Sequence, residues 1–430
     1  MFIGLGLGLV AQAIYGGVGD NALNDYGTPF FLADFIESEY RNNGPLTSSF
    51  TALTGLSYSG PAITRYGTTP GGVLVPFAAG VPAIVPGRGL LIEGARTNLC
   101  LRSQEFDNAS WTTSNGTLTP DAAVAPDGTT TADRLVGTAA SSQGRVSQSI
   151  AGSIGATYTW SCYVNSAGGT LVRIYADDNA TNIASVTYNT ITGAVSVAAA
   201  IGGGNWTAVS SAAQQLGNGW WRFSLTFTAT TVAPARFQVW HRDTSDGTSG
   251  IYIWGAQLEA AAFPSSYIPT TTTSVTRAAD VCSIAVSGLA YPMTLFAEFE
   301  RVVDTGVTEA ILLATDGTVN NYSGFFVTSS DLARAAMAVG AVTQANPIVA
   351  GALAVATSYR VAARFTTNSV QVAKGGVLGT EDTSATTPAS PININLGMFP
   401  DGTAYSFGYH SEFAIIPGAF TDAQLQAVSS

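Results

Sequence analysis

Two carboxylates on one predicted strand are the strongest acid–base candidates in the sequence. Glu298 and Glu300 lie in LFAEFERV, a run that alternates like a β-strand, so both side chains should face the same side. Paired carboxylates can hydrolyse glycosidic bonds. The alternative is a solvated strand face, with Leu295, Ala297 and Phe299 turned toward a core. No third acid accompanies the pair, so we favour the solvated face and expect that the protein is not an enzyme.

Aromatic and arginine side chains on two predicted strands suit a different chemistry. In GWWRFSLTF, Trp220 and Arg222 lie on the face opposite the apolar stripe, and in RFQVWHRD, Gln238, Trp240 and Arg242 do the same. An outward indole ring flanked by arginine and glutamine offers stacking and hydrogen bonds to a sugar. We therefore predict these five residues as a glycan-binding site. The alternative is that loops or another subunit cover both tryptophans.

The histidines and cysteines offer no comparable site. His241 and His410 lie in predicted strands with no GxSxG elbow near a serine, so we interpret both as structural. Cys100, Cys162 and Cys282 are far apart and lack CxxC spacing, so we interpret them as small buried hydrophobic residues.

Calcium is the one metal that the sequence suggests. Asp177, Asp178 and the loop HRDTSDGTSG (241–250) offer oxygen ligands, but neither stretch has EF-hand spacing. Asp and Asn are also common turn residues. We predict no cofactor and keep Ca²⁺ as an alternative.

The N-terminus has an unusual glycine pattern. As a strand, IGLGLGLV would have one bare face and one face of leucines, and a bare face permits close approach of several copies around a symmetry axis. We therefore predict that this segment anchors an oligomer or attaches to a particle, through Gly4, Leu5, Gly6, Leu7, Gly8 and Leu9. The alternative is a flexible or cleaved terminus. The segment lacks the basic region of a signal peptide and is too short to span a membrane.

Composition excludes some classes of partner. Only 10% of the 430 residues are charged, the net charge is −11, and lysine occurs once, at Lys374. Such a balance argues against binding nucleic acid. A surface of neutral hydroxyl and amide groups suits a durable particle or contact with neutral polar ligands.

Short alternating runs predict an all-β protein. Residues 251–254 alternate Ile with Tyr and Trp, so this strand is apolar on both faces, and the AQLEAAAF stretch after it continues into a loop because it is too short and uncapped for a helix. NTITGAVSV predicts a hairpin at Gly193, and Thr421 with Gln424 predicts a capped C-terminal helix. The predicted strands are 132–136, 145–150, 157–164, 171–176, 184–189, 194–199, 221–229, 235–242, 250–259, 293–302, 309–314, 323–328, 358–365, 368–376, 392–399 and 411–418.

Four stretches in order resemble a recurrent block of tailed-phage and prophage fibre or spike proteins. They are RGLLIEGARTNLCLRSQEFDNASWT (88–112), APDGTTTADRLV (125–136), GNGWWRFSLTFTAT (217–230) and WGAQLEAAAFPSSYIPTTTTSVTRAAD (254–280). FAIIPGAFTDAQLQAV (413–428) is similar to the usual ending of a concanavalin A-like, laminin-G-like sandwich. The block covers about residues 88–280.

This resemblance implies four regions. We expect an extended N-terminal attachment and oligomerisation region (1–98), a central jelly roll resembling carbohydrate-binding modules (99–265), a linker (266–280) and a concanavalin A-like sandwich (281–430). The implied protein is a head spike or tail fibre on the surface of a virion or phage-like particle. It would be a homo-oligomer, first a trimer and alternatively a pentamer, joined to capsid or tail proteins through its N-terminus. It would adhere to host-surface polysaccharide without inserting into a membrane. The alternatives are a glycan depolymerase and a purely structural connector.

Overall fold

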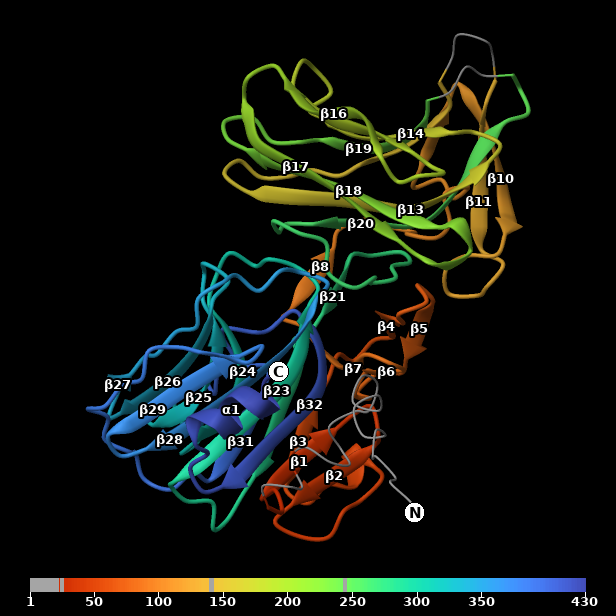
Figure 1. Cartoon of the computed structure of the whole chain (residues 1–430). Coiled ribbons are helices and arrows are strands. Elements are labelled where there is room, and N and C mark those ends of the chain that lie inside the picture. The colour runs from red at the N-terminus through yellow and green to blue at the C-terminus, as the bar shows by residue number, and fades with distance from the viewer. Residues whose placement is uncertain (1–22, 24–26, 139–142, 243–245) are drawn as a thin grey trace, which may run out of the picture. The chain divides into compact units, whose positions relative to one another are not determined.

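The regular secondary structure of the described chain is almost entirely antiparallel β-sheet, which confirms the all-β prediction (Figure 1). The computed structural model describes residues 23, 27–138, 143–242 and 246–430. The chain forms two compact units. Unit 1 contains 1–59, 86–94 and 280–430, and unit 2 contains 60–85 and 95–279.

This division differs from the four regions expected from the sequence. The described residues before 98 form no separate region, because β1 (Phe31–Asp34), β3 (Leu56–Ser59) and β7 (Gly89–Ile92) each pair with strands of the C-terminal half. Residues 266–280 are not a free linker either. Tyr267 and Ile268 are buried, and β21 (Val275–Arg277) pairs with β8 (Arg96–Asn98). The segment GLGLGL at 4–9 lies outside the described residues, so its predicted role in attachment stays a prediction.

Unit 1 is a sandwich of two sheets. One has the order β2-β1-β32-β23-β28-β29-β30, with β7 also pairing with β32, and the other has the order β27-β26-β25-β24-β31-β22-β3. The strands are β1 (Phe31–Asp34), β2 (Glu39–Asn42), β3 (Leu56–Ser59), β7 (Gly89–Ile92), β22 (Val281–Ala285), β23 (Met293–Arg301), β24 (Glu309–Thr315), β25 (Tyr322–Val327), β26 (Ala333–Val339), β27 (Val342–Ala345), β28 (Ser358–Thr366), β29 (Ser369–Lys374), β30 (Val377–Leu378), β31 (Asn393–Leu396) and β32 (Gly408–Pro417).

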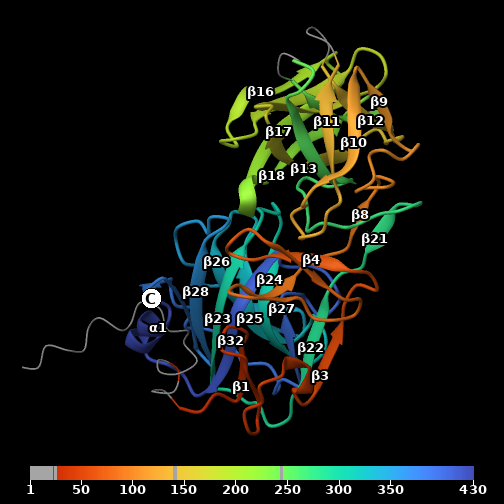
Figure 2. The ribbon, with the colours of Figure 1, turned by 90° about the vertical axis from the view of Figure 1, so that its right-hand side faces the viewer.

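The predicted C-terminal helix is present and covers part of one sheet. Helix α1 (Asp422–Val428) begins with the expected capping box, in which the Thr421 hydroxyl accepts from the Gln424 backbone N–H and the Gln424 side chain accepts from the Thr421 N–H. Leu425 and Val428 pack on the sheet beside Phe296, and α1 lies beside β28 in both views (Figures 1 and 2). No helix within the described residues is long and apolar enough to cross a membrane.

Unit 2 is a jelly-roll sandwich of two six-stranded sheets. We call them the β20 sheet, with the order β10-β11-β20-β13-β18-β17, and the β19 sheet, with the order β16-β15-β14-β19-β12-β9. In Figure 1, β16, β19 and β14 mark one layer, and β17, β18, β13 and β20 mark the other. The strands are β9 (Thr112–Ser114), β10 (Gly116–Ala123), β11 (Ala132–Gly137), β12 (Arg145–Ser149), β13 (Thr157–Ala167), β14 (Leu171–Asp177), β15 (Ile183–Asn189), β16 (Val195–Gly202), β17 (Trp206–Gln215), β18 (Trp221–Ala229), β19 (Arg236–His241) and β20 (Gly250–Glu259).

The space between these sheets holds the main core of unit 2. Trp160 and Phe223 from the β20 sheet meet Ile174, Phe237 and Val239 from the β19 sheet, and none of the five is exposed. Alternation along each strand places these residues on one face, and their burial drives the two sheets together.

The other face of the β20 sheet is also covered. Tyr66 and Leu74, from the hairpin of β4 (Arg65–Thr68) and β5 (Leu74–Phe77), pack with Tyr163, Trp254 and Tyr267 in a second apolar layer. Strand β20 is therefore central and buried on both faces, as the sequence predicted.

The carboxylate of Glu259 fixes the loop that closes this second layer. Glu259 is fully buried where β20 ends, and it accepts hydrogen bonds from the Ser265 N–H at 2.9 Å, the Ser265 hydroxyl at 2.6 Å and the Gln257 amide at 2.8 Å. Arg222 donates to the Ser265 carbonyl at 2.6 Å. The stretch AQLEAAAF is thus a strand that runs into a loop, as predicted, and its glutamate is a structural residue.

We predict that Glu259→Ala lowers the free energy of unfolding by about 3 kcal/mol, because several buried donors lose their acceptor. Chemical denaturation of the full chain measures the change. Glu105→Ala is the control, because Glu105 forms a partly exposed ion pair with Arg102 and its loss should cost less than about 1 kcal/mol. Equal losses in the two variants would contradict the structural role of Glu259.

Candidate functional site

The outward face of the β19 sheet gathers aromatic and cationic side chains. Along β14, Val172, Ile174 and Ala176 point into the core, so Arg173 and Tyr175 point outward. Both outward residues are partly exposed. The sequence analysis did not single out this strand as part of a site, although LVRIYAD shows the same alternation as the strands that it did select.

Strand register brings two arginines beside Trp240. Arg145 on β12 and Arg173 on β14 are the cross-strand neighbours of Trp240 on β19. The Arg145 guanidinium lies 5.0 Å from the indole centroid and that of Arg173 lies 5.9 Å away. Tyr175 stacks on the indole with ring centroids 4.9 Å apart. Trp240 is thus partly exposed, as predicted, but it is held among these three side chains and is not a bare platform.

A buried polar network supports the indole from below. The Trp240 N–H donates to the Gln238 side-chain oxygen at 3.0 Å, and the Gln238 amide donates to Asp177 at 2.5 Å. Arg236 also pairs with Asp177 at 3.0 Å. Gln238 is only 1% exposed, so it orients Trp240 and does not face solvent as the sequence analysis expected.

Arg242 extends the cationic part of this face. It follows β19, and its backbone N–H bonds the Leu171 carbonyl beside Arg173. Burial lowers the pKa of the Arg173 guanidinium, and the nearby charge of Arg242 lowers it further. The two like charges therefore repel each other on the sheet surface.

The other two predicted glycan-binding residues are buried. Trp220 is 3% exposed in the second apolar layer and donates its indole N–H to the Val124 carbonyl at 3.2 Å. Arg222 is 5% exposed and bonds Ser161 and Ser265. The predicted alternation was right, but the expectation that these side chains face outward was wrong, because this face meets the second apolar layer. The edge of Trp220 lines a hollow of about 440 Å³ with Val73 and Val124.

The two carboxylates proposed for acid–base chemistry have separate surroundings. Glu300 forms a bidentate ion pair with Arg88, with distances of 2.5 and 3.1 Å, and the Arg88 guanidinium lies over the Tyr409 ring. Glu298 accepts from the Ser358 hydroxyl at 3.2 Å and lies 3.7 Å from Arg360. Because Glu300 is occupied by Arg88, the pair does not form a free acid and base.

Glu298 instead belongs to a row of carboxylates that crosses one sheet of unit 1. Cross-strand register places Glu39, Asp34, Glu412 and Glu298 side by side, with Arg360 next. Glu412 is 2% exposed, and its Oε1 has no hydrogen-bond partner among the described residues. Burial raises the pKa of Glu412 well above the usual 4.5, the neighbouring carboxylates raise it further, and Arg360 lowers it.

The histidines and cysteines are structural within the described residues. His410 is buried, bonds the Ser406 hydroxyl at 2.8 Å, and has its pKa lowered to about 3 by burial. His241 is also buried. All three cysteines are free and buried, as predicted, and burial raises the pKa of Cys162 to about 12.

The aspartates considered for calcium serve turns and ion pairs. Asp178 accepts from the Ala180 and Asn182 backbones, and Asp246 accepts from those of Thr248 and Ser249. Residues 243–245 of the second loop lie outside the described part of the chain. Among the described residues, no three His, Cys, Asp or Glu side chains group as a metal site.

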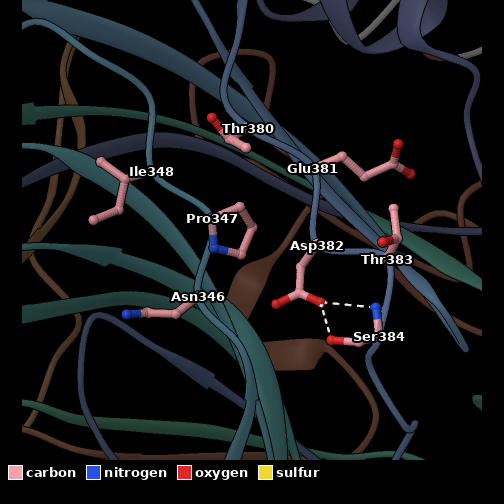
Figure 3. Close-up of a pocket in the computed structure, with 8 residues that line it drawn as sticks. All are labelled: Asn346, Pro347, Ile348, Thr380, Glu381, Asp382, Thr383 and Ser384. Carbon is pink, nitrogen blue, oxygen red and sulfur yellow. Dashed lines mark hydrogen bonds between the residues drawn. The ribbon is translucent and has the colours of Figure 1, made fainter.

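A separate hollow of about 510 Å³ lies in unit 1 between the loops at 346–348 and 380–384 (Figure 3). Asp382 uses one carboxylate oxygen to accept from the Ser384 backbone and hydroxyl. Glu381 is paired with Arg364 at 2.7 Å. The residues that line this hollow include no aromatic side chain, so it lacks a ring for stacking on a sugar.

The comparisons with known proteins give distant structural likenesses only. The sequence matches no protein-family model and no curated protein. The Ruminococcus gnavus IT-sialidase CBM40 domain bound to α2,3-sialyllactose is 16% identical, with 33% of this chain and 84% of that chain covered and a TM-score of 0.30. Domain 4 of the Geobacillus stearothermophilus arabinanase AbnA in complex with arabinotriose is 11% identical, with coverages of 39% and 82% and a TM-score of 0.30. Mouse laminin α1 LG4-5 is 10% identical, with coverages of 76% and 88% and a TM-score of 0.24. At these TM-scores the likenesses identify neither a family nor a ligand for this chain.

We predict that Trp220→Ala lowers the free energy of unfolding by about 4 kcal/mol and leaves glycan affinity unchanged, because Trp220 fills a core. Denaturation and glycan-binding titrations of the folded variant measure the two effects. Trp240→Ala, at a partly exposed position, is the control and should cost less stability. If Trp220→Ala lost glycan binding without losing stability, Trp220 would belong to the binding site after all.

We also predict that stability falls as pH rises from 5 to 8, because the folded state holds a proton on Glu412 that the unfolded state releases. The contribution is fully present below the ordinary glutamate pKa and is lost as pH rises through the raised value. Glu412→Gln should flatten this dependence and raise the thermal midpoint at pH 8, and Glu105→Gln should not. Parallel pH profiles for wild type and Glu412→Gln would show that Glu412 does not control the dependence.

Proposed function

We propose that the protein binds polysaccharide through the outward face of the β19 sheet. The observation that carries this proposal is the stacked pair of Tyr175 and Trp240, partly exposed and bordered by Arg145 and Arg173. Aromatic rings offer apolar surface to the C–H faces of a sugar, and guanidinium groups and hydroxyls offer hydrogen bonds to its polar groups. The network through Gln238 holds the indole in place before a ligand arrives, which reduces the entropic cost of binding.

We further propose that this binding serves adhesion of a phage or phage-like particle to host-surface polysaccharide. The resemblance of residues 88–280 to fibre and spike proteins supports this role. The protein would be a head spike or tail fibre, attached through its N-terminus to capsid or tail proteins and assembled as a trimer or pentamer. A shallow face binds one sugar chain weakly, so several copies would be needed for tight adhesion.

The two alternatives make different demands on the chain. A glycan depolymerase would need an acid and a base at one accessible place, and the ion pair with Arg88 occupies Glu300. A purely structural connector would bury Trp240 against another protein in the particle. The connector therefore competes for the same face and is the stronger alternative.

We predict that Trp240→Ala weakens binding to a responsive glycan by about tenfold, because truncating a tryptophan at the centre of a contact typically costs more than 1 kcal/mol. A glycan array screened with the purified full chain identifies the ligand, and titrations measure the change. Trp240→Phe keeps a ring and should retain part of the affinity. Val342→Ala, at an exposed position of unit 1, is the control.

Release of reducing ends, followed in the same titrations, separates adhesion from hydrolysis. Binding without release supports the adhesin. No binding by the intact protein would favour the connector, and sugar release would favour the depolymerase.

A further inference from the structure

The outward face of the β19 sheet has an excess of positive charge in an acidic protein. Arg145, Arg173, Arg236 and Arg242 lie on or directly after its strands, out of 17 Lys and Arg residues in a chain of net charge −11. Asp177 is the single acidic residue on the six strands. Asp178 follows β14 directly and accepts from the turn after it, and Asp177 pairs with Arg236, so among the described residues no carboxylate pairs with Arg145, Arg173 or Arg242.

Several arginines elsewhere in the described chain are paired with carboxylates. Arg301 is buried with Glu309 at 2.9 Å and Asp331 at 2.7 Å, and Arg364 pairs with Glu381 and Asp422. In contrast, Arg145, Arg173 and Arg242 form no ion pair with a described residue. Arg222 and Arg334 also lack an ion pair within the described chain, but neither lies on this face, where three such arginines occur together.

The three guanidinium groups keep hydrogen-bond donors available to a ligand. Arg173 donates its Nε–H to the Thr187 hydroxyl at 3.1 Å, which directs its two terminal nitrogens away from that contact. The Arg145 guanidinium lies over the Trp240 ring, and no hydrogen bond to a described residue uses its N–H donors. Burial lowers the pKa of Arg242, and the positive charges of Arg242 and Arg173 repel each other. An anion placed between them would relieve this repulsion.

We propose that the ligand of this face is an acidic glycan. The carboxylate of one sugar binds between the guanidinium groups of Arg173 and Arg242, and the ring of that sugar lies against Trp240 and Tyr175, with Arg145 on the other side of the indole. This inference rests on the proposed glycan-binding function and names its substrate class. A planar guanidinium donates two parallel hydrogen bonds to a carboxylate, which gives orientation as well as attraction. The rings beside the arginines provide the apolar surface that a pyranose needs and a free inorganic anion does not use.

The test compares polymers that differ only in their carboxylates. Uronic-acid and sialic-acid polymers are titrated against the purified full chain, each beside the same polymer after its carboxyl groups have been reduced to alcohols. Dextran sulfate and neutral dextran report sulfate binding and charge-independent binding. We expect at least one acidic polymer to bind, and its carboxyl-reduced form to bind at least tenfold more weakly. Affinity should also fall as NaCl rises from 50 to 500 mM.

Matched arginine variants assign the effect to this face. Arg173→Gln should weaken binding of the acidic polymer by about tenfold. Arg173→Lys keeps the charge but not the fork and should fall between Gln and wild type. Arg102→Gln is the control, because it removes the same charge from a partly exposed pair outside the β19 sheet. Circular dichroism and denaturation confirm that each variant is folded.

The outcomes separate this inference from the proposed function. Equal binding of acidic and carboxyl-reduced polymers, with Trp240→Ala still weakening both, would overturn the acidic assignment and leave glycan binding in place. Binding of dextran sulfate alone would overturn the carboxylate. No binding of any polymer would overturn both proposals. Equal losses in Arg173→Gln and Arg102→Gln would show that the effect is one of net charge and not of this site.

Discussion

Unit 2 depends on the burial of both faces of the β20 sheet. One face meets the β19 sheet, and the other meets Tyr66, Leu74 and Tyr267 from segments before and after the strands. A chain with only 10% charged residues has few side chains with which to solvate an open sheet face, so a second covering layer is a direct solution. Glu259 and Arg222 hold that layer in place through the Ser265 backbone. The Ser265 N–H donates to Glu259 and the Ser265 carbonyl accepts from Arg222, so these buried polar groups have hydrogen-bond partners. With the β20 sheet enclosed, the outward face of the β19 sheet is the broad sheet surface of this unit that presents rings and charges to a ligand.

The sequence predicted about half of the described strands, those whose alternation is visible along the chain, and β18 and β20 have the predicted bounds. It missed β17, whose WTAVSSAAQQ is rich in Ser, Ala and Gln and has no alternating aromatic residues. Two of the five predicted site residues, Trp220 and Arg222, were misplaced for a different reason. Alternation correctly placed Trp220 opposite Phe223, but a single strand does not reveal whether its second face meets water or another segment. The segment that covers it lies about 150 residues earlier in the chain, at 60–85.

Strand register explains how a chain with so few charged residues forms one cluster of arginines and one cluster of carboxylates. Arg145 and Arg173 come to the two sides of Trp240 only when β12, β19 and β14 align, and Asp34 reaches Glu412 only when β1 pairs with β32. Neither cluster is visible as a motif, since its members are scattered along the sequence. The arginine cluster is partly exposed and keeps donors available, which is why we propose it as the ligand-binding site. The carboxylate cluster contains the buried Asp34 and Glu412, so its effect falls on the stability of unit 1.

The path of the chain has a consequence for biosynthesis. The backbone passes between the two units at 59–60, 85–86, 94–95 and 279–280. Both β1 and β7 pair with β32, which ends at Pro417. While the ribosome is still making the middle of the chain, β1 can pair with β2, but the edges of β1 and β7 that will later meet β32 are unpaired and open to other nascent chains. The sheet that contains β32 can therefore close only after residues 408–417 have been made, whereas unit 2 contains no strand beyond residue 279 and can form earlier.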